Sequence, residues 1–571
     1  MADASQRVPY LKLLPELSRA VLWWLWTPFR VWYRRTWLYR RLLKGALSDR
    51  ILFHPYDATP RKLEDADALL RGRFRFHGEM VEAREGSVFD MRPPSLEWAK
   101  ALHSFAWLPP LALAGGEPAR VLAMNLMTQW LKRHSKYSEP AWSPDVMARR
   151  LIHLFAHGRL MIANSELMWR SKVFVSLREQ SRMLARIAQE SPDGICRFEA
   201  AAAYALSGAC LGDSQRRLEE GLKCLEGQIA RQILPDGGHI SRSPEQLLNA
   251  YRLIMMVMDA LNANGLEVPH AIRSGYDRIA PMIRFFRHGD GALALFNGGT
   301  ECDPRTVAGL LARDEVRGQP YTYARHSAYQ RMTAGKTMLL LDCGSVPPGP
   351  FSDQAHAGCL ALELSSGSQR IIVNCGAAGA SQPRWESALR ATAAHSTLVL
   401  ADASMAMILP PGLARNLLGA RMLKGPEQIE TRRVETTQGW SIEASHDGYV
   451  EPWGIRHERE VTLSQQGLAL TGVDRLLPQQ GNKHKDWPFA IRFHVHPDIR
   501  MSPSQGGGIL LKLPTGEGWR FRSGASATIE ESVYLGSEQV RRAEQIVLTG
   551  AVKDQQVDIA WVFEQIGALS S

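Results

Sequence analysis

Residues 234–246, LPDGGHISRSPEQ, combine side chains suited to a ligand site with the signals of a helix start. Ser243 stands directly before Pro244, and Gln246 follows the serine by three residues. This is a capping-box pattern, in which a serine at the N-cap is paired with Gln or Glu at the third helical position and proline suits the first. The pattern predicts a helix that begins at Pro244, and it requires no further function.

The rest of this turn carries groups that a helix cap does not need. Asp236, two glycines, His239 and Arg242 stand just before the predicted helix. The N-terminus of a helix offers free N–H groups and a partial positive charge, which together favour an anion. His239 and Arg242 would add donors, so the turn suits a carboxylate or a sulfate. In the alternative interpretation Asp236 and the glycines only shape the turn, and the sequence does not decide between the two.

Amphipathic helices are expected to position this turn. From about residue 95 to residue 290 the apolar residues recur with a period near 3.6, in successive segments separated by short turns. Many antiparallel helices joined in this way predict an incomplete α/α toroid. The last of them should begin at Pro244 and bury one stripe of side chains that includes Leu247, Tyr251 and Ile254.

Near residue 325 the pattern changes to short β-rich runs separated by Gly, Pro, Asn and Ser. Such spacing is typical of an antiparallel β-sandwich. The chain is therefore predicted to be a multidomain α+β protein. Its expected parts are a basic Trp- and Arg-rich segment (1–90), an α/α toroid domain (91–325) and a C-terminal β-sandwich domain (326–571). A chain of 571 residues is long enough for several such domains.

The net charge of +10 is concentrated at the N-terminus, where residues 1–50 carry ten Lys and Arg against three acids. The remainder is nearly neutral, which argues against a nucleic-acid binder. The uncharged run 20–29 has about half the length that a membrane-spanning helix needs. Residues 20–45 could form an interfacial helix that touches a membrane. The favoured alternative is a Trp-rich helix packed on the main body with its arginines in solvent.

The seven cysteines form no CxxC pair and are odd in number, which weakly favours a reducing compartment over a disulfide framework. The N-terminal segment lacks a clean cleavage site for a signal peptide. The sequence therefore leaves the compartment open among the periplasm, the cytoplasm and the inner face of a membrane. It also leaves the oligomeric state open.

Six segments, in this order on an α-then-β chain, resemble the heparinase II/III family of polysaccharide-lyase-like proteins. They are WSPDVMARR (142–150), DGGHISRSP (236–244), HAGCLALEL (356–364), IIVNCG (371–376), RATAAHSTLV (390–399) and RFHVHP (492–497). The resemblance implies β-elimination on a uronic-acid polysaccharide, of the heparin, heparan or alginate type. Family members often work in the periplasm.

Elimination needs a group that neutralises the uronate carboxylate, a base for the C5 proton and an acid for the leaving oxygen. In the family Asn or His does the first task, and Tyr and His share the other two. The family tyrosine falls on Gln246 and the family histidine on Gln354, and neither amide can titrate. The family's Asn-His pair has no counterpart in residues 196–211.

The resemblance also implies a structural zinc ion, which the family binds through His, Asp and His. The corresponding residues are His356, Asn374 and His395, and an asparagine binds zinc more weakly than a carboxylate does. His494 and His496 share a strand face and could join the cluster. Alternatively, His356 and His395 are hydrogen-bonded structural residues without a metal.

Two interpretations of function follow. In the first, the chain is a lyase in which His239, Arg242, His356 or Tyr251 has taken over the acid–base chemistry. In the second, it binds an anionic glycan or glycolipid without cleaving it. Arginines hold carboxylates and sugars stack on aromatic rings, so both interpretations use the same candidate contacts. These are Trp142, Arg149, Arg150, Gln246, Gln354, Arg384 and Trp385.

The segment 284–301 is expected to join the two domains. Its Arg287, His288 and Asp290 are placed either in the same cleft or in a purely structural linker, and the sequence favours neither placement.

Overall fold

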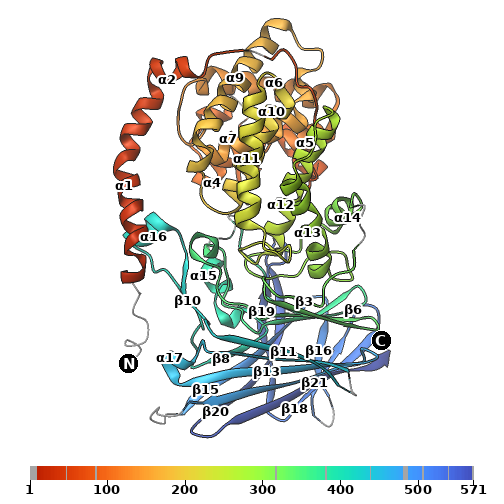
Figure 1. The fold of residues 1–571 in the computed structure, drawn as a ribbon. Coiled ribbons are helices and arrows are strands. Elements are labelled where there is room, and N and C mark those ends of the chain that lie inside the picture. The colour runs from red at the N-terminus through yellow and green to blue at the C-terminus, as the bar shows by residue number, and fades with distance from the viewer. Residues whose placement is uncertain are drawn as a thin grey trace.

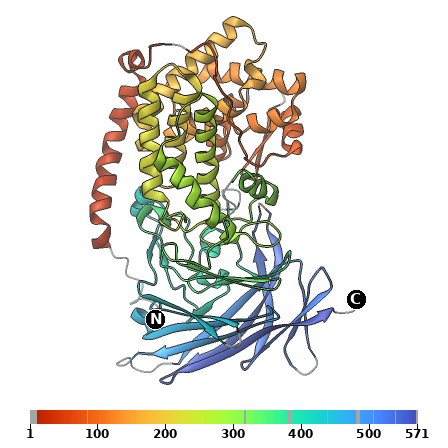
Figure 2. The same ribbon diagram turned by 45° about the vertical axis from the view of Figure 1, so that its right-hand side comes forward.

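The computed structural model describes residues 10–46, 48–83, 86–314, 318–379, 382, 384–436, 439–479, 486–504, 507–537 and 539–568. An α-helical N-terminal part stands on a C-terminal part built from antiparallel sheets, and helix α1 (Tyr10–Arg35) runs along one flank of both (Figures 1 and 2). The predicted order, an incomplete α/α toroid followed by an antiparallel β-sandwich, is confirmed.

Three helices, a small hairpin and a 3-10 turn precede the toroid. These elements are α1, α2 (Trp37–Leu42), α3 (Leu63–Leu70), β1 (Arg73–Phe76), β2 (Glu79–Glu82) and the 3-10 turn η1 (Val88–Asp90). Strands β1 and β2 pair in antiparallel register, with Phe74 opposite Val81. No helix among the described residues is both long enough and apolar enough to cross a membrane.

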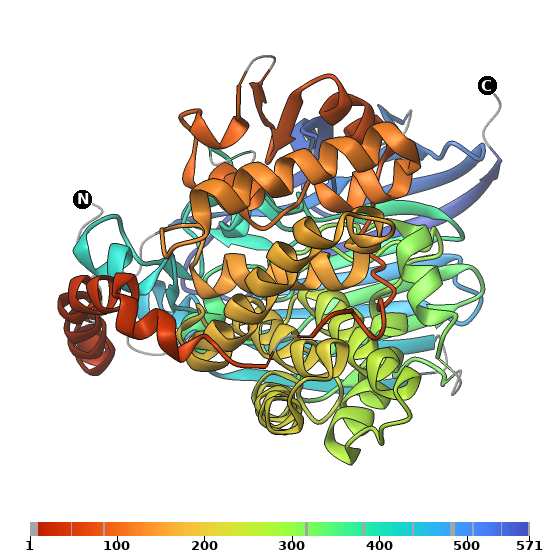
Figure 3. The same ribbon diagram turned by 90° about the horizontal axis from the view of Figure 1, so that it is seen from above.

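The toroid is an open arc of helices, with α1 outside it, as the view from above shows (Figure 3). Its helices are α4 (Leu96–His103), α5 (Leu108–Ala114), α6 (Gly116–His134), α7 (Pro144–His157), α8 (Arg159–Ile162), α9 (Leu167–Ile187), α10 (Ile195–Leu211), α11 (Gln215–Gln232), α12 (Pro244–Ala263), α13 (His270–Phe286) and α14 (Pro304–Leu311), with the 3-10 turn η2 (Ala188–Glu190) after α9. Helix α10 is buried along most of its length.

Small residues let α10 and α11 approach closely. A Cβ atom built on Gly208 would lie 2.4 Å from the Cα of Leu218, and one built on Gly221 would lie 2.7 Å from the Cα of Ala205. Both separations are shorter than van der Waals contact, so a larger residue at either glycine would push the helices apart. The alanine run 200–203 serves the same packing, because alanine is a strong helix former with little bulk.

The β domain contains two large sheets. One has the order β11-β12-β13-β14-β21-β18-β17-β16, and the other has the order β19-β20-β15-β7-β6-β5-β4-β3, with β8 paired to β15. The first sheet comprises β11 (Ile429–Thr436), β12 (Gly439–His446), β13 (Ile455–Ser464), β14 (Ala469–Pro478), β16 (Arg500–Pro503), β17 (Ile509–Lys512), β18 (Glu517–Ser523) and β21 (Val557–Ala568). The second comprises β3 (Tyr323–Ala324), β4 (Tyr329–Ala334), β5 (Thr337–Asp342), β6 (Leu362–Ser366), β7 (Gln369–Val373), β8 (Leu398–Leu400), β15 (Trp487–Val495), β19 (Ala527–Tyr534) and β20 (Arg541–Val552).

Short elements complete the β domain. They are β9 (Met407–Ile408), β10 (Met422–Lys424), α15 (Glu386–Leu389), α16 (Leu413–Leu418), α17 (Val450–Trp453), η3 (Gly349–Ser352) and η4 (Thr392–Ala394). The inner faces of the large sheets bury a shared apolar core that includes Val461, Leu463, Phe493 and Trp561. Side chains of β13 alternate between buried and half-buried positions, as expected for a strand with one face on the core.

Helix α1 lies against the body by its polar face. Glu16 forms an ion pair with Arg421, which stands just before β10, and Arg30 and Arg34 both reach Glu190 in η2. The expected packing of the tryptophans on the body is therefore wrong, because these rings face solvent. The expected exposure of the arginines does not hold for Arg30 and Arg34, although Arg35, Arg40 and Arg41 are exposed. The reason is that a carboxylate on the toroid and an arginine of the β domain offer partners to the charged side of this helix.

Candidate functional site

The turn between α11 and α12 joins the two domains. Asp236 accepts hydrogen bonds from the backbone of Gly238, His326 and Ser327, and from the Ser327 hydroxyl at 2.9 Å. Gly237 has a φ of +85°, and a Cβ built there would lie 1.9 Å from the Arg278 carbonyl oxygen. Asp236 and the glycines thus shape the turn and fix it to the start of the β domain.

Arg242 also links the turn to the β domain, and it does not form the anion-binding site that the sequence suggested. Its guanidinium forms a buried ion pair with Asp342, donates to the carbonyls of Ser327 (3.0 Å) and Ser345 (3.1 Å), and lies 4.6 Å from the ring centre of Tyr329. The residue is 8% exposed. Its charge is already satisfied by protein groups, so the prediction that Arg242 acts on a substrate is wrong.

His239 is also a structural residue. Its Nε2 lies 3.0 Å from Gln232 Oε1 and its Nδ1 lies 2.6 Å from the Ser241 hydroxyl. Burial lowers the pKa of His239 to about 3, so the ring is neutral at physiological pH. Only 1% of His239 is exposed and both ring nitrogens are bonded, so the side chain cannot reach a substrate. The predicted catalytic role of His239 is therefore wrong.

Tyr251 is the third predicted catalytic residue that the structure places in the core. It lies on the inward face of α12, fully buried, and stacks on Tyr276 with ring centres 4.6 Å apart. Burial raises the pKa of its hydroxyl. The prediction of a catalytic Tyr251 is wrong because the apolar stripe of α12 that contains it faces other helices.

The two glutamines that the resemblance assigns to the family's tyrosine and histidine positions, Gln246 and Gln354, lie side by side. Gln246 Nε2 donates to Gln354 Oε1 at 3.0 Å, and this bond is exposed to solvent. The Ser243 hydroxyl accepts the Gln246 N–H at 3.5 Å, so the predicted helix cap is present. Two neutral amides therefore occupy, bonded to each other, the place where an acid and a base would be expected.

A loop from the domain junction closes around this pair. The Asn297 side chain accepts the backbone N–H of His356 at 3.2 Å and donates to the Tyr329 hydroxyl at 2.8 Å. The backbone at Gly298 packs closely against Gln354, since a Cβ built on Gly298 would lie 2.7 Å from the Gln354 carbonyl oxygen. No sequence pattern pointed to Asn297, because its importance depends on contacts between segments far apart in the chain.

His356 and His395 come together, as the resemblance implied. Their ring centres are 5.2 Å apart, and both residues are buried. Within the described part of the chain, His356 Nδ1 and both ring nitrogens of His395 have no hydrogen-bond partner. Burial lowers the pKa of His395 to about 3 and the pKa of His356 well below its usual value, so both rings are neutral. The predicted third ligand, Asn374, is fully buried nearby.

The donor set does not suit zinc. Asn374 donates to Glu363 Oε1 at 3.1 Å and accepts the Ser396 N–H at 3.1 Å, so its amide is held by the protein. His494 is occupied as well, with its Nε2 3.0 Å from the Ala393 carbonyl. No group of three or more His, Cys, Asp or Glu suited to a metal occurs among the residues that the structure describes. Zinc normally takes three or four protein ligands.

The predicted substrate contacts in the toroid divide into buried and open residues. Arg150 is fully buried and donates to Gln180 and to the carbonyls of His103 and Ala141. Trp142 is 3% exposed and stacks on a neighbouring tryptophan. The predictions of substrate contact for Arg150 and Trp142 are wrong, since both stabilise the helical core.

Three further candidates keep some access to solvent and remain predictions. Arg149 forms an ion pair with Glu199 at 2.8 Å while its side chain stays 37% exposed. Arg384 is exposed, and Trp385 is half-buried at the start of α15, where it packs near Leu389.

The linker residues have separate roles. Asp290 forms an ion pair with Arg370 at 2.7 Å, which is structural. Arg287 and His288 line a cavity with three other basic side chains, Arg284, Arg331 and Lys336. The sequence did not reveal this cluster, because it joins a helix end to a distant β-hairpin.

Known proteins are similar in sequence to this chain and to its β domain. Residues 316–562 match the model of the heparinase II/III-like C-terminal domain. The chain is 31% identical over 516 residues to FtsZ-localized protein C of Caulobacter vibrioides, and the match covers 88% of each chain. The chain belongs to the heparinase II/III family.

All seven cysteines are free, as expected.

Solved structures of this family share the fold. The crystal structure of heparinase III matches with a TM-score of 0.70 at 14% identity, covering 98% of this chain and 92% of that one. Heparan sulfate lyase HepC of Pedobacter heparinus matches with a TM-score of 0.59 at 15% identity, covering 98% and 91%. The heparinase fold is therefore present over nearly the whole chain, with glutamines at the two positions discussed above.

Proposed function

We propose that this protein is a non-cleaving member of the heparinase II/III family that localises with FtsZ at a membrane surface. The family relative with the extended sequence match is named for its localisation to FtsZ. That match covers both the helical and the β part of the chain, so the proposal concerns the whole protein.

The observation that carries the proposal is the orientation of α1. Its charged residues Glu16, Arg30 and Arg34 face the body, whereas Trp26, Phe29 and other large apolar residues face solvent. A soluble protein gains no stability from exposing such a surface, and a contiguous exposed apolar patch usually marks an interaction site.

The chemistry of this surface fits a lipid headgroup region. Trp26 and Phe29 are in edge contact with ring centres 5.8 Å apart, and Phe29 and Trp32 follow at 5.7 Å. Tryptophan favours the membrane–water boundary, and an amphipathic helix with aromatic and basic residues lies in the plane of that boundary. Exposed Arg35 at the end of α1, Arg40 in α2 and the other exposed basic residues nearby would complement anionic lipids.

The bonded glutamine pair supports the non-cleaving part of the proposal. General acid–base catalysis needs groups whose pKa lies near the working pH, and an amide has none. Gln246 and Gln354 satisfy each other, so neither is poised to exchange a proton with a sugar.

The experiment is to express fluorescent fusions of the full chain together with labelled FtsZ in its native cells. We expect the wild type to coincide with FtsZ structures at the membrane and a Trp26→Ser, Trp32→Ser double variant to become diffuse. Wild-type fluorescence that is spread evenly and independent of FtsZ would overturn the proposal.

A second candidate is a polysaccharide lyase with a relocated base, acting on a uronic-acid polysaccharide. His356 favours it, because this neutral imidazole has an unbonded Nδ1 and stands two residues from Gln354. Ultraviolet detection of the unsaturated product, lost on His356→Ala, would support this candidate over the first.

A further inference from the structure

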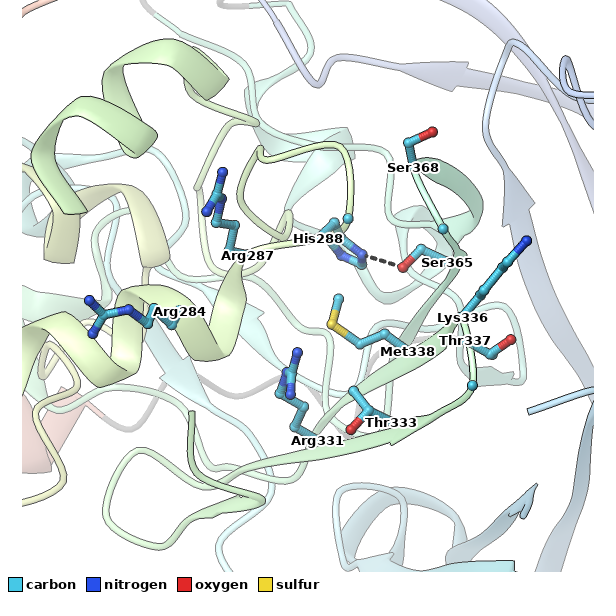
Figure 4. Close-up of a pocket in the computed structure, with 13 residues that line it drawn as sticks. Arg284, Arg287, His288, Arg331, Thr333, Lys336, Thr337, Met338, Ser365 and Ser368 are labelled. Atoms are coloured by element: carbon cyan, nitrogen blue, oxygen red, sulfur yellow. Dashed lines mark hydrogen bonds between the residues drawn. The ribbon is translucent and has the colours of Figure 1, made fainter. Parts of the chain in front are cut away.

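A basic cavity lies on the domain junction, apart from the glutamine pair. Its volume is about 580 Å³, within the range of small-molecule sites. The C-terminal end of α13, the hairpin of β4 and β5, and the turn between β6 and β7 line it (Figure 4). Helix α13 belongs to the toroid and the strands to the second sheet, so both domains build it.

Of the four Arg and Lys side chains in this cavity, only Arg284 has a carboxylate partner among the described residues. Arg284 is paired with Asp314 at 2.5 Å. Arg287 donates to the Gly291 carbonyl at 3.2 Å. In the part of the chain that the structure describes, no carboxylate forms an ion pair with Arg287, Arg331 or Lys336.

Arg331 is the most informative member of this group. Its Nε is buried without a hydrogen-bond partner among the described residues, and burial lowers its pKa. A half-buried guanidinium with an unbonded nitrogen and no counter-charge is unfavourable, and binding of an anion relieves that cost. In Figure 4, Met338 lies between His288 and Arg331, and the Lys336 side chain points outward at the edge of the site.

The lining also limits the kind of anion. Hydroxyl groups of Thr333 and Ser368 stand among the cations, and His288 is bonded to Ser365 at 2.9 Å and to Glu363 at 2.9 Å. Among the lining residues no Phe, Tyr or Trp is present, so a nucleobase would find no ring for stacking. Guanidinium groups recognise the paired oxygens of phosphate and sulfate by two parallel hydrogen bonds.

We propose that this cavity binds a small, non-aromatic ligand that carries at least two phosphate or sulfate groups. Three cations without carboxylate partners match a ligand of two or more negative charges. The hydroxyl groups suit the polar body of such a ligand, for example a phosphorylated or sulfated sugar. This site uses neither α1 nor the glutamine pair, so it stands or falls separately from the proposed function.

The test is isothermal titration calorimetry of the full-length protein with inorganic pyrophosphate, and in parallel with a disulfated disaccharide. We expect saturable binding of at least one probe at one site per chain. Lys336→Gln and Arg331→Gln should each weaken it by roughly 10- to 100-fold, as for loss of a hydrogen bond to a charged group. Arg273→Gln removes an exposed arginine of α13, the helix that Arg287 caps, and this matched control should bind as the wild type does.

The probes also separate the two sources of such anions, since preference for one identifies phosphate or sulfate as the natural group. Lys336 is exposed, so its variant decides the outcome if Arg331→Gln fails to fold. Absence of saturable binding for both probes would overturn the proposal. Binding that is equal in the wild type and in Lys336→Gln and Arg331→Gln would overturn it as well.

Discussion

The exposed rings of Trp26, Phe29 and Trp32 form an aromatic ridge on α1. This ridge should determine membrane binding, and a double substitution tests that expectation. We consider Trp26→Ser with Trp32→Ser, because both rings contact Phe29 and lie on the face turned away from the body. Trp26 is 59% exposed and Trp32 is 61% exposed, so removing them takes little from the folded core. The change should therefore affect partitioning and leave stability nearly unaltered.

The magnitude follows from the exposed area. A tryptophan side chain offers up to about 250 Å², and with 59% and 61% exposure each leaves about 150 Å² open. If about half of that enters the lipid, burial at about 25 cal/mol per Å² contributes roughly 1.9 kcal/mol for each ring. The pair then contributes about 3.8 kcal/mol, which corresponds to a loss of roughly 500-fold in the partition coefficient.

The assay is flotation of the purified full-length protein with vesicles that contain anionic phospholipid. The matched control is Tyr56→Ser with Trp440→Ser, since these two residues are 55% and 38% exposed on other elements. We expect the control to float as the wild type does. If the partition coefficient of the ridge variant is within about threefold of the wild-type value, the free energy of partitioning falls by less than about 0.7 kcal/mol. That result would show that the ridge does not determine membrane binding.

Three further predictions concern the core and the histidine pair. Arg242→Gln should lower the free energy of unfolding by about 3–5 kcal/mol, because it leaves Asp342 buried and uncompensated; a loss below about 1 kcal/mol in urea titrations would contradict this. Burial favours the neutral carboxyl of Asp474, but Arg459 outweighs it and holds the pKa below the ordinary value of 3.8. Ionised Asp474 thus contributes stability above that value, and this is lost as the pH falls through the lowered pKa; Asp474→Asn should be less stable at neutral pH and flatter in acid, whereas parallel wild-type and variant curves would refute the assignment. Metal analysis of the purified protein should find less than one zinc per chain, and a full equivalent that disappears in His395→Ala would show that a ligand set does form.

The elements themselves were largely predictable from local patterns. Helix α12 begins at Pro244 with Ser243 as its cap, and its stripe of Leu247 and Ile254 is buried as the period of 3.6 indicates. The β-rich runs after residue 325 form antiparallel strands, because alternation and turn residues specify a sandwich. These features depend on neighbours in sequence, which a single chain displays.

The roles of individual polar residues were not predictable in the same way. His239 and Arg242 have the chemistry of a ligand site, yet His239 is bonded within its own turn to Gln232 and Ser241, and Arg242 is bonded to Asp342 of β5. Whether Arg242 contacts a substrate or a buried aspartate depends on how the two domains pack together. The sequence around Arg242 does not reveal that packing. The orientation of α1 depended on Glu190, far along the chain.

The proposed non-cleaving role requires that this heparinase fold does not carry out elimination. The most direct measurement is ultraviolet absorbance of the purified protein with heparin, heparan sulfate, chondroitin, alginate and bacterial exopolysaccharides, because elimination creates a conjugated double bond whichever residue acts as base. Because Gln246 and Gln354 are bonded to each other, we expect no rise in absorbance with any of these polymers. A rise in absorbance that scales with protein concentration and disappears in His356→Ala would contradict this expectation.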